Sequence, residues 1–292
     1  MKQLLAWVCV LPLAGSTYAA PTWSVDLNNS SLNLNGDTYA DNGAHGFRPA
    51  GPWDEDSLDE DTFQANFVVG PDTFDLGASV NPISRDRDLS VPYDTSASAV
   101  SIVTIHGVGS NTLEIAWRAN TFNDQFDGDG FLSTSEAHVL ASILARIDGV
   151  SPGTPVSISY EWEYFATAVP DHEGVGEDPE QARGSLSLID NAGGGPGNLF
   201  DIMVGEPGPA PLTDFDDDID SHNLVTGVPD SFLTIDLAAS SITAMESPGD
   251  GLFDEDLAGS EFIGTLTLVI VPEPAVGTLL IGGLGLLAKR RR

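Results

Sequence analysis

Alternation of apolar and polar residues is the strongest constraint on the fold of this chain. In Val156–Tyr164 every second residue is aliphatic or aromatic, and serine or glutamate fills most of the positions between. A period of two residues is that of a β-strand with one face buried and the other in solvent. This stretch therefore predicts a half-buried strand.

Runs of the same kind recur along the chain, with glycine, proline, asparagine and aspartate between them. The clearer runs are Trp23–Leu27, Phe63–Val69, Val100–Val108, Leu113–Ala119, Val156–Ala166, Ser185–Ile189, Phe232–Leu237 and Phe262–Val271. Many short strands with turn-rich connections are typical of antiparallel sandwiches. We therefore predict a mainly β fold, an antiparallel, jelly-roll-like β-sandwich.

One segment predicts a short helix. Leu140, Ile143, Leu144 and Ile147 have the spacing of a single helix face, beginning near Ser135. Asp148-Gly149 would end that helix. We expect long polar stretches such as Asn35–Asp61 to be loops.

The N-terminal segment 1–20 has the layout of a secretory signal peptide. Lys2 supplies the positive charge, Leu4–Gly15 is apolar, and small residues follow up to Ala20. Cys9, the single cysteine, lies inside it. We therefore expect residues 21–270 to form an exported domain without disulfides.

That body is strongly acidic. Six arginines stand against 43 acidic residues, which gives it a net charge of −37. Such a field repels nucleic acid and anionic lipid and attracts divalent cations, so we expect no nucleic-acid partner. Adaptation to a saline habitat and a dedicated cation-binding role both explain the charge.

The C-terminal segment 271–292 has three parts in order. Pro272, Glu273 and Pro274 break the preceding strand, Ala275–Ala288 carries no charge, and Lys289–Arg292 is wholly basic. As a helix, the uncharged part would span about 21 Å of a hydrocarbon core about 30 Å thick. We predict a C-terminal transmembrane helix with its cations in the cytoplasm.

This tail resembles the PEP-CTERM sorting signal of Gram-negative bacteria. The resemblance implies that an exosortase recognises the protein and cleaves it near Pro272, Glu273 and Pro274. It also implies a setting of extracellular polysaccharide and biofilm production. The protein would be held at the cell surface or periplasmic face, with release after cleavage. The alternative is a plain C-terminal membrane anchor.

A weaker resemblance, to the calcium loops of EF-hand and dockerin proteins, lies in Gln125–Glu136. Oxygen ligands at alternate positions, a glycine at the sixth and a glutamate at the twelfth define such loops. Here Gly130 is the sixth residue, and the ligands would be Gln125, Asp127, Asp129, Phe131 through its carbonyl, Ser133 and Glu136. Because Gln125 replaces an aspartate, we expect weak calcium binding. The alternative is a polar turn in which Ser133 or Thr134 caps the helix.

Two other acidic features are ambiguous. Asp214–Asp220 is expected to be a solvated loop, with a second calcium site as the less favoured interpretation. Glu161 and Glu163 lie about 7 Å apart on one strand face, a spacing that glycoside hydrolysis can use. Two exposed glutamates on an acidic protein are the favoured interpretation.

The sequence contains none of the HExxH, G-x-S-x-G, P-loop or GxGxxG motifs. We therefore predict a non-enzymatic, surface-anchored protein of the extracellular matrix, with calcium as a candidate stabilising ion. One alternative is a carbohydrate-binding or glycoside-hydrolase-like jelly-roll module that uses Trp117, Trp162 or Tyr164 as stacking surfaces. Another is a surface-layer component whose acidic face bridges neighbours through calcium.

Overall fold

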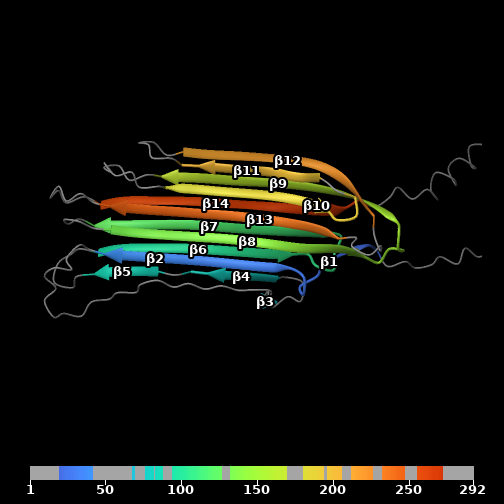
Figure 1. The fold of residues 1–292 in the computed structure, drawn as a ribbon, viewed down its shortest axis with the longest axis horizontal. Coiled ribbons are helices and arrows are strands. Elements are labelled where there is room, and N and C mark those ends of the chain that lie inside the picture. The colour runs from blue at the N-terminus through green and yellow to red at the C-terminus, as the bar shows by residue number, and fades with distance from the viewer. Residues whose placement is uncertain are drawn as a thin grey trace, which may run out of the picture.

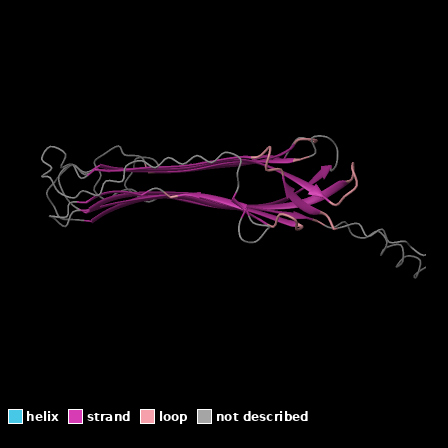
Figure 2. Cartoon of the chain, turned by 90° about the horizontal axis from the view of Figure 1, so that it is seen from below, coloured by secondary structure: helices cyan, strands magenta, loops and turns pink. Residues whose placement is uncertain are grey.

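The protein is nearly all antiparallel β-sheet. The computed structural model describes residues 20–41, 68–69, 76–81, 83–87, 94–126, 132–169, 180–193, 196–205, 212–225, 232–246 and 255–271. Every regular element in these residues is a strand. The strands form two facing sheets, as Figure 2 shows. The predicted mainly β, sandwich-like fold is therefore confirmed.

The first sheet has six strands, with the order β1-β8-β13-β10-β11 and β2 paired to β8 beside β1. Its strands are β1 (Thr22–Val25), β2 (Ser31–Asp41), β8 (Leu132–Asp148), β10 (Gln181–Asp190), β11 (Pro196–Val204) and β13 (Leu233–Glu246).

The second sheet has eight strands, with the order β12-β9-β14-β7-β6-β4-β3 and β5 paired to β6 beside β4. They are β3 (Val68–Val69), β4 (Leu76–Val80), β5 (Ile83–Arg87), β6 (Asp94–His106), β7 (Thr112–Phe126), β9 (Pro155–Val169), β12 (Leu212–Val225) and β14 (Glu255–Ile270). All pairings in both sheets are antiparallel.

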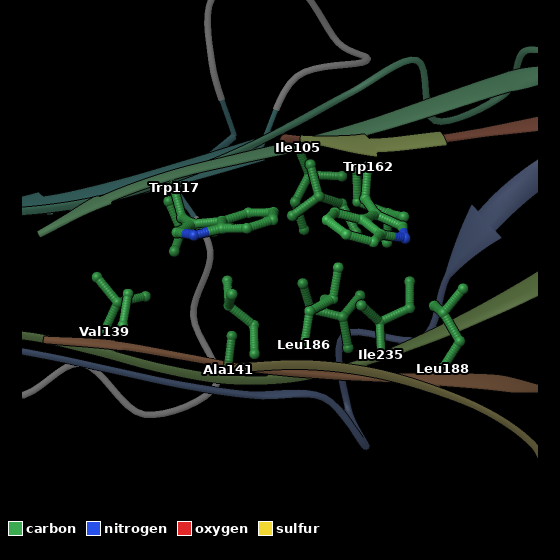
Figure 3. Packing of buried hydrophobic residues seen from close by; sticks show 14 of the residues in the cluster. Ile105, Trp117, Val139, Ala141, Trp162, Leu186, Leu188 and Ile235 are labelled. Carbon is green, nitrogen blue, oxygen red and sulfur yellow. The ribbon is translucent and has the colours of Figure 1, made fainter. Parts of the chain in front are cut away.

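The core lies between the two sheets. Along β9 the even-numbered residues from Val156 to Ala168 are buried and the odd-numbered ones face outward. Trp117 and Trp162 of one sheet face Val139, Leu186 and Ile235 of the other across the interior (Figure 3). The alternation in the sequence thus positions the core.

Two glycines make room for the largest rings. A side chain at Gly184 of β10 would overlap the ring of Phe262, which reaches across from β14. A side chain at Gly264 would meet the indole of Trp117 on the neighbouring strand. Both positions require the smallest residue because a buried ring occupies the place of a Cβ atom.

The predicted helix is wrong, because its residues belong to β8. Ile143 and Ile147 point into the core, whereas Leu140 points outward and is 54% exposed. Two apolar residues on each face imitate the helical spacing. Pairing with β13 on one side and with β1 and β2 on the other fixes the strand, and such tertiary pairing overrides local helical preference.

Two expected loops are also strands. Asp214–Asp220 lies within β12, paired to β9 over the whole segment. The first part of the Asn35–Asp61 stretch, up to Asp41, belongs to β2 and pairs with β8. In both cases a neighbouring strand supplies the hydrogen bonds that a polar sequence does not reveal.

The sandwich has two distinct ends (Figure 1). At the end that carries β1, called the near end, the backbone N–H of Trp23 donates to the carbonyl of Ser110 at 2.7 Å, and that of Ile270 donates to the carbonyl of Asn111 at 2.8 Å. The first and last strands therefore meet the same β6–β7 turn. At the far end, Phe126 pairs with Glu255 and Leu132 with Glu246. From its 16 residues, β14 separates the two ends by about 50 Å.

Candidate functional site

The predicted calcium loop connects β7 to β8 at the far end. Gln125 is the next-to-last residue of β7 and pairs with Thr95 of β6 and Asp256 of β14. Asp127, Asp129 and Phe131 lie outside the described residues. The structure therefore bears only on the two ends of this segment.

Ser133 and Glu136 lie on opposite faces of β8. Ser133 is buried, and its carbonyl accepts a 3.0 Å hydrogen bond from the Asn123 amide. Glu136 points outward, and its Oε2 lies 3.2 Å from Nε2 of His138. A three-residue separation on a strand directs side chains to opposite faces, so these two side chains do not converge. The exiting helix expected after the loop is a strand.

The three aromatic residues considered as carbohydrate-stacking surfaces are in the core. Trp117, Trp162 and Tyr164 are each less than 7% exposed. The rings of Trp162 and Tyr164 stack with centroids 6.0 Å apart, and Phe200 packs against both from the opposite sheet. Rings packed in this way present no face to a sugar.

Glu161 and Glu163 lie on the outer face of the same strand, β9, and are exposed. Thr265 donates its hydroxyl to Oε1 of Glu163 at 3.2 Å. Because they point away from the buried aromatics, these carboxylates do not share a groove with Trp162 or Tyr164.

The aspartates of β12 divide between the two faces of an edge strand. Asp214, Asp216, Asp218 and Asp220 pair with Ala166, Tyr164, Trp162 and Tyr160, and so share the face on which those side chains project. The hydroxyl of Tyr164 donates to Oδ2 of Asp214 at 3.0 Å, and that of Tyr160 to Oδ2 of Asp220 at 3.3 Å. The Asp214–Asp220 segment is thus an ordered strand whose aspartates border the core.

A hydroxyl network fills the interior near the far end, and the sequence interpretation missed it. Thr121 lies 2.7 Å from Ser241 and from Thr243, and 2.9 Å from Ser260, all oxygen to oxygen. These residues come from β7, β13 and β14 and are buried. The sequence does carry a signal for this network. In each strand, serine or threonine occupies the inward-facing, alternate positions that follow or precede the apolar ones.

His138 and His222 each lie beside a carboxylate. Besides His138 with Glu136, Nε2 of His222 on β12 lies 3.0 Å from Oδ2 of Asp190 at the end of β10. The Asp190 carboxylate is almost fully buried and also accepts the N–H of Ala192. Over the described ranges, no three histidine, cysteine or acidic side chains come together as a metal-ion site.

The proposed sorting residues Pro272, Glu273 and Pro274 lie outside the described residues, which end at Val271. Val271 donates its N–H to the carbonyl of Ser157 at 2.9 Å, so the chain is held up to this residue at the near end. Within the residues that the structure describes, no helix is long and apolar enough to cross a membrane.

Comparison with known proteins identifies no relative. No family model and no curated protein sequence matches the chain. A solved structure of infectious bursal disease virus, Gx strain, aligns with 87% of this chain and 60% of the viral chain at 10% identity. Its TM-score of 0.12 is too low to indicate a shared fold.

Proposed function

We propose that the protein is an exported, non-enzymatic component of the extracellular matrix, held at the cell surface by its C-terminal tail. The tail sequence carries this proposal: Pro272-Glu273-Pro274, then the uncharged Ala275–Ala288, then Lys289–Arg292. An exosortase is the partner that recognises this tail, residues 1–20 are the signal peptide, and the uncharged segment is the transmembrane helix.

The geometry of the sandwich supports this arrangement. The chain reaches Val271 at the near end, immediately before the tail. The far end, where β7, β8, β13 and β14 begin or end, then lies about 50 Å from the point of attachment. An elongated body whose strands extend about 50 Å away from the membrane suits contact with neighbouring matrix, such as extracellular polysaccharide.

A structural role, rather than sugar cleavage, agrees best with the acidic and aromatic residues. Glu161 and Glu163 face solvent on the outer face of β9, while Trp162 and Tyr164 are buried on its inner face. A glycosidase needs carboxylates beside the rings or polar groups that hold the sugar. Weak calcium binding at Gln125–Glu136 would add stability at the far end.

The test compares the full chain with a chain that ends at Val271, both produced in a Gram-negative host that has an exosortase. We expect the full chain in the cell envelope, where protease added to intact cells degrades it. We expect the shortened chain in the periplasm or medium. The same distribution for both chains would contradict surface anchoring through the tail.

A matched variant separates sorting from plain anchoring. Glu273→Ala keeps the uncharged segment and the basic end. If the tail is only a membrane anchor, the wild-type chain and the Glu273→Ala chain should both stay in the membrane with their tails uncleaved. If an exosortase acts, mass spectrometry of the wild-type chain should show a C-terminus near Pro272–Pro274. The Glu273→Ala chain should then keep its tail.

A further inference from the structure

The free edge of the eight-stranded sheet is a hazard for the protein. Among the described strands β12 pairs with β9 alone, so one side of its 14 residues is open. Phe215 and Ile219 project from it with 60% and 64% of their surface exposed. A long edge strand with exposed apolar side chains invites another strand to add to it.

Four aspartates cap four of the backbone N–H groups of this edge. Oδ1 of each aspartate accepts the N–H of the residue that follows it, at 2.7 to 3.0 Å. The donors, Phe215, Asp217, Ile219 and Ser221, are alternate residues. In an antiparallel strand alternate N–H groups point to the same side, and here that is the side away from β9.

The core holds the two outer carboxylates in this position. While Oδ1 of Asp214 accepts an edge N–H, its Oδ2 accepts the hydroxyl of Tyr164. Asp220 is held by Tyr160 in the same way. An incoming strand would have to break the hydrogen bonds of all four carboxylates and approach their charges.

We propose that Asp214, Asp216, Asp218 and Asp220 close the free edge of β12 against pairing with the β12 strand of a second copy of this chain. A second copy is the partner excluded because antiparallel pairing of two identical edges is self-complementary about a two-fold axis. It would also place Phe215 and Ile219 of both copies in one continuous sheet. This inference does not depend on the proposed surface display.

Three double variants of the full chain, in the same mild detergent, test the proposal. Asp216→Thr with Asp218→Thr removes two carboxylate acceptors and leaves good strand formers. Asp216→Asn with Asp218→Asn removes the same charge but keeps an oxygen that can accept the edge N–H. Glu163→Thr with Asp217→Thr removes two nearby carboxylates that accept none of these N–H groups.

The measurement is molar mass by sedimentation, together with hydrogen exchange of the peptide covering residues 212–225. We expect the threonine variant to shift to dimers or larger species, with slower exchange in that peptide. We expect the asparagine variant and the Glu163/Asp217 variant to keep the mass of the parent chain. Unchanged exchange in β9 peptides shows that the fold is retained.

Two results would overturn the proposal. A threonine variant with the parent's mass and exchange would mean that the aspartates do not protect the edge. Association of either comparison variant to the same extent would mean that charge repulsion, rather than hydrogen-bond capping, keeps the copies apart.

Discussion

Two tyrosines mark the margin where the buried core meets the acidic edge. Tyr160 and Tyr164 have their rings in the core and their hydroxyls on Asp220 and Asp214. Burial, followed by the interaction with the neighbouring carboxylate, raises the pKa of both phenols, and that of Tyr164 most. Each tyrosine therefore stays protonated, and its hydroxyl donates a hydrogen bond to the aspartate, over a wide pH range.

This shift predicts a loss of stability in alkali. The folded-state pKa of Tyr164 lies above the ordinary value of 10.0, so its contribution is complete below that pH. The contribution is lost as pH rises through the folded-state pKa, because unfolding releases the proton. We expect Tyr164→Phe to have a smaller fall in thermal midpoint above about pH 10 than wild type. Equal falls in both proteins would contradict this assignment.

Single residues differ in how far the sequence predicts their role. The alternation of β9 predicted that Trp162 and Tyr164 point inward, as they do. The sequence could not predict that the β12 aspartates cap edge N–H groups, because this depends on which side of the strand lacks a neighbouring strand. An aspartate string has the same composition in a solvated loop and on a protected edge.

Among the elements, β8 was wrongly predicted to be a helix, whereas β12 and the first part of the Asn35–Asp61 stretch were wrongly predicted to be loops. A helix places residues i and i+3 on one face, and a strand places them on opposite faces. We therefore expect Leu140→Ala to change the free energy of unfolding by less than about 0.5 kcal/mol. Ile143→Ala should cost about 2–5 kcal/mol, since its side chain is fully buried. Chemical denaturation measures both, and similar losses would favour a helix.

The start of β8 also bears on the calcium prediction, because Ser133 and Glu136 lie on opposite faces of that strand and cannot both hold one ion. We expect the Gln125–Glu136 segment to bind calcium with a dissociation constant of about 10⁻⁴–10⁻³ M, because it has one carboxylate fewer than the usual loop. Millimolar calcium should then raise the thermal midpoint of wild type more than that of Glu136→Gln. Asp217→Asn serves as the control for general loss of acidic charge. Equal stabilisation of all three proteins would remove this segment as a site.

The sequence predicted elements well where each strand has one apolar and one polar face. Predicted runs overlap with β6, β7, β9, β10, β13 and β14, and each of these strands extends beyond its run at one end or both. The extensions, such as Asn120–Asp124 of β7, are mostly polar because their side chains line the hydroxyl network or face solvent. Pairing between strands distant in sequence determines their length, and no local pattern encodes it.

At the scale of the whole molecule, charge dominates the behaviour expected in solution. In the body, residues 21–270, six arginines cannot neutralise 43 acidic residues, and three of the described arginines, Arg118, Arg146 and Arg183, already pair with carboxylates. Repulsion among the remaining carboxylates opposes folding until salt screens it, over about 10 Å at 0.1 M and about 3 Å at 1 M.

We therefore expect the thermal midpoint to rise between about 0.1 M and about 1 M sodium chloride, and to rise most per unit of added salt at the low end of this range. Sucrose at matched osmolality is the control, because it favours the compact state without screening charge. A midpoint that does not move with salt, or that sucrose raises equally, would contradict the repulsion argument.

The position of β14 in its sheet determines how the body would respond to force. This strand is the last before the tail and lies between β7 and β9, paired along nearly its full length on both sides. A pull on Val271 away from the far end acts along the strand axis. Such a load shears both rows of hydrogen bonds at once, instead of opening them one after another as in unzipping an edge strand. The chain therefore leaves the sandwich from a central strand of the eight-stranded sheet, a position that resists extraction.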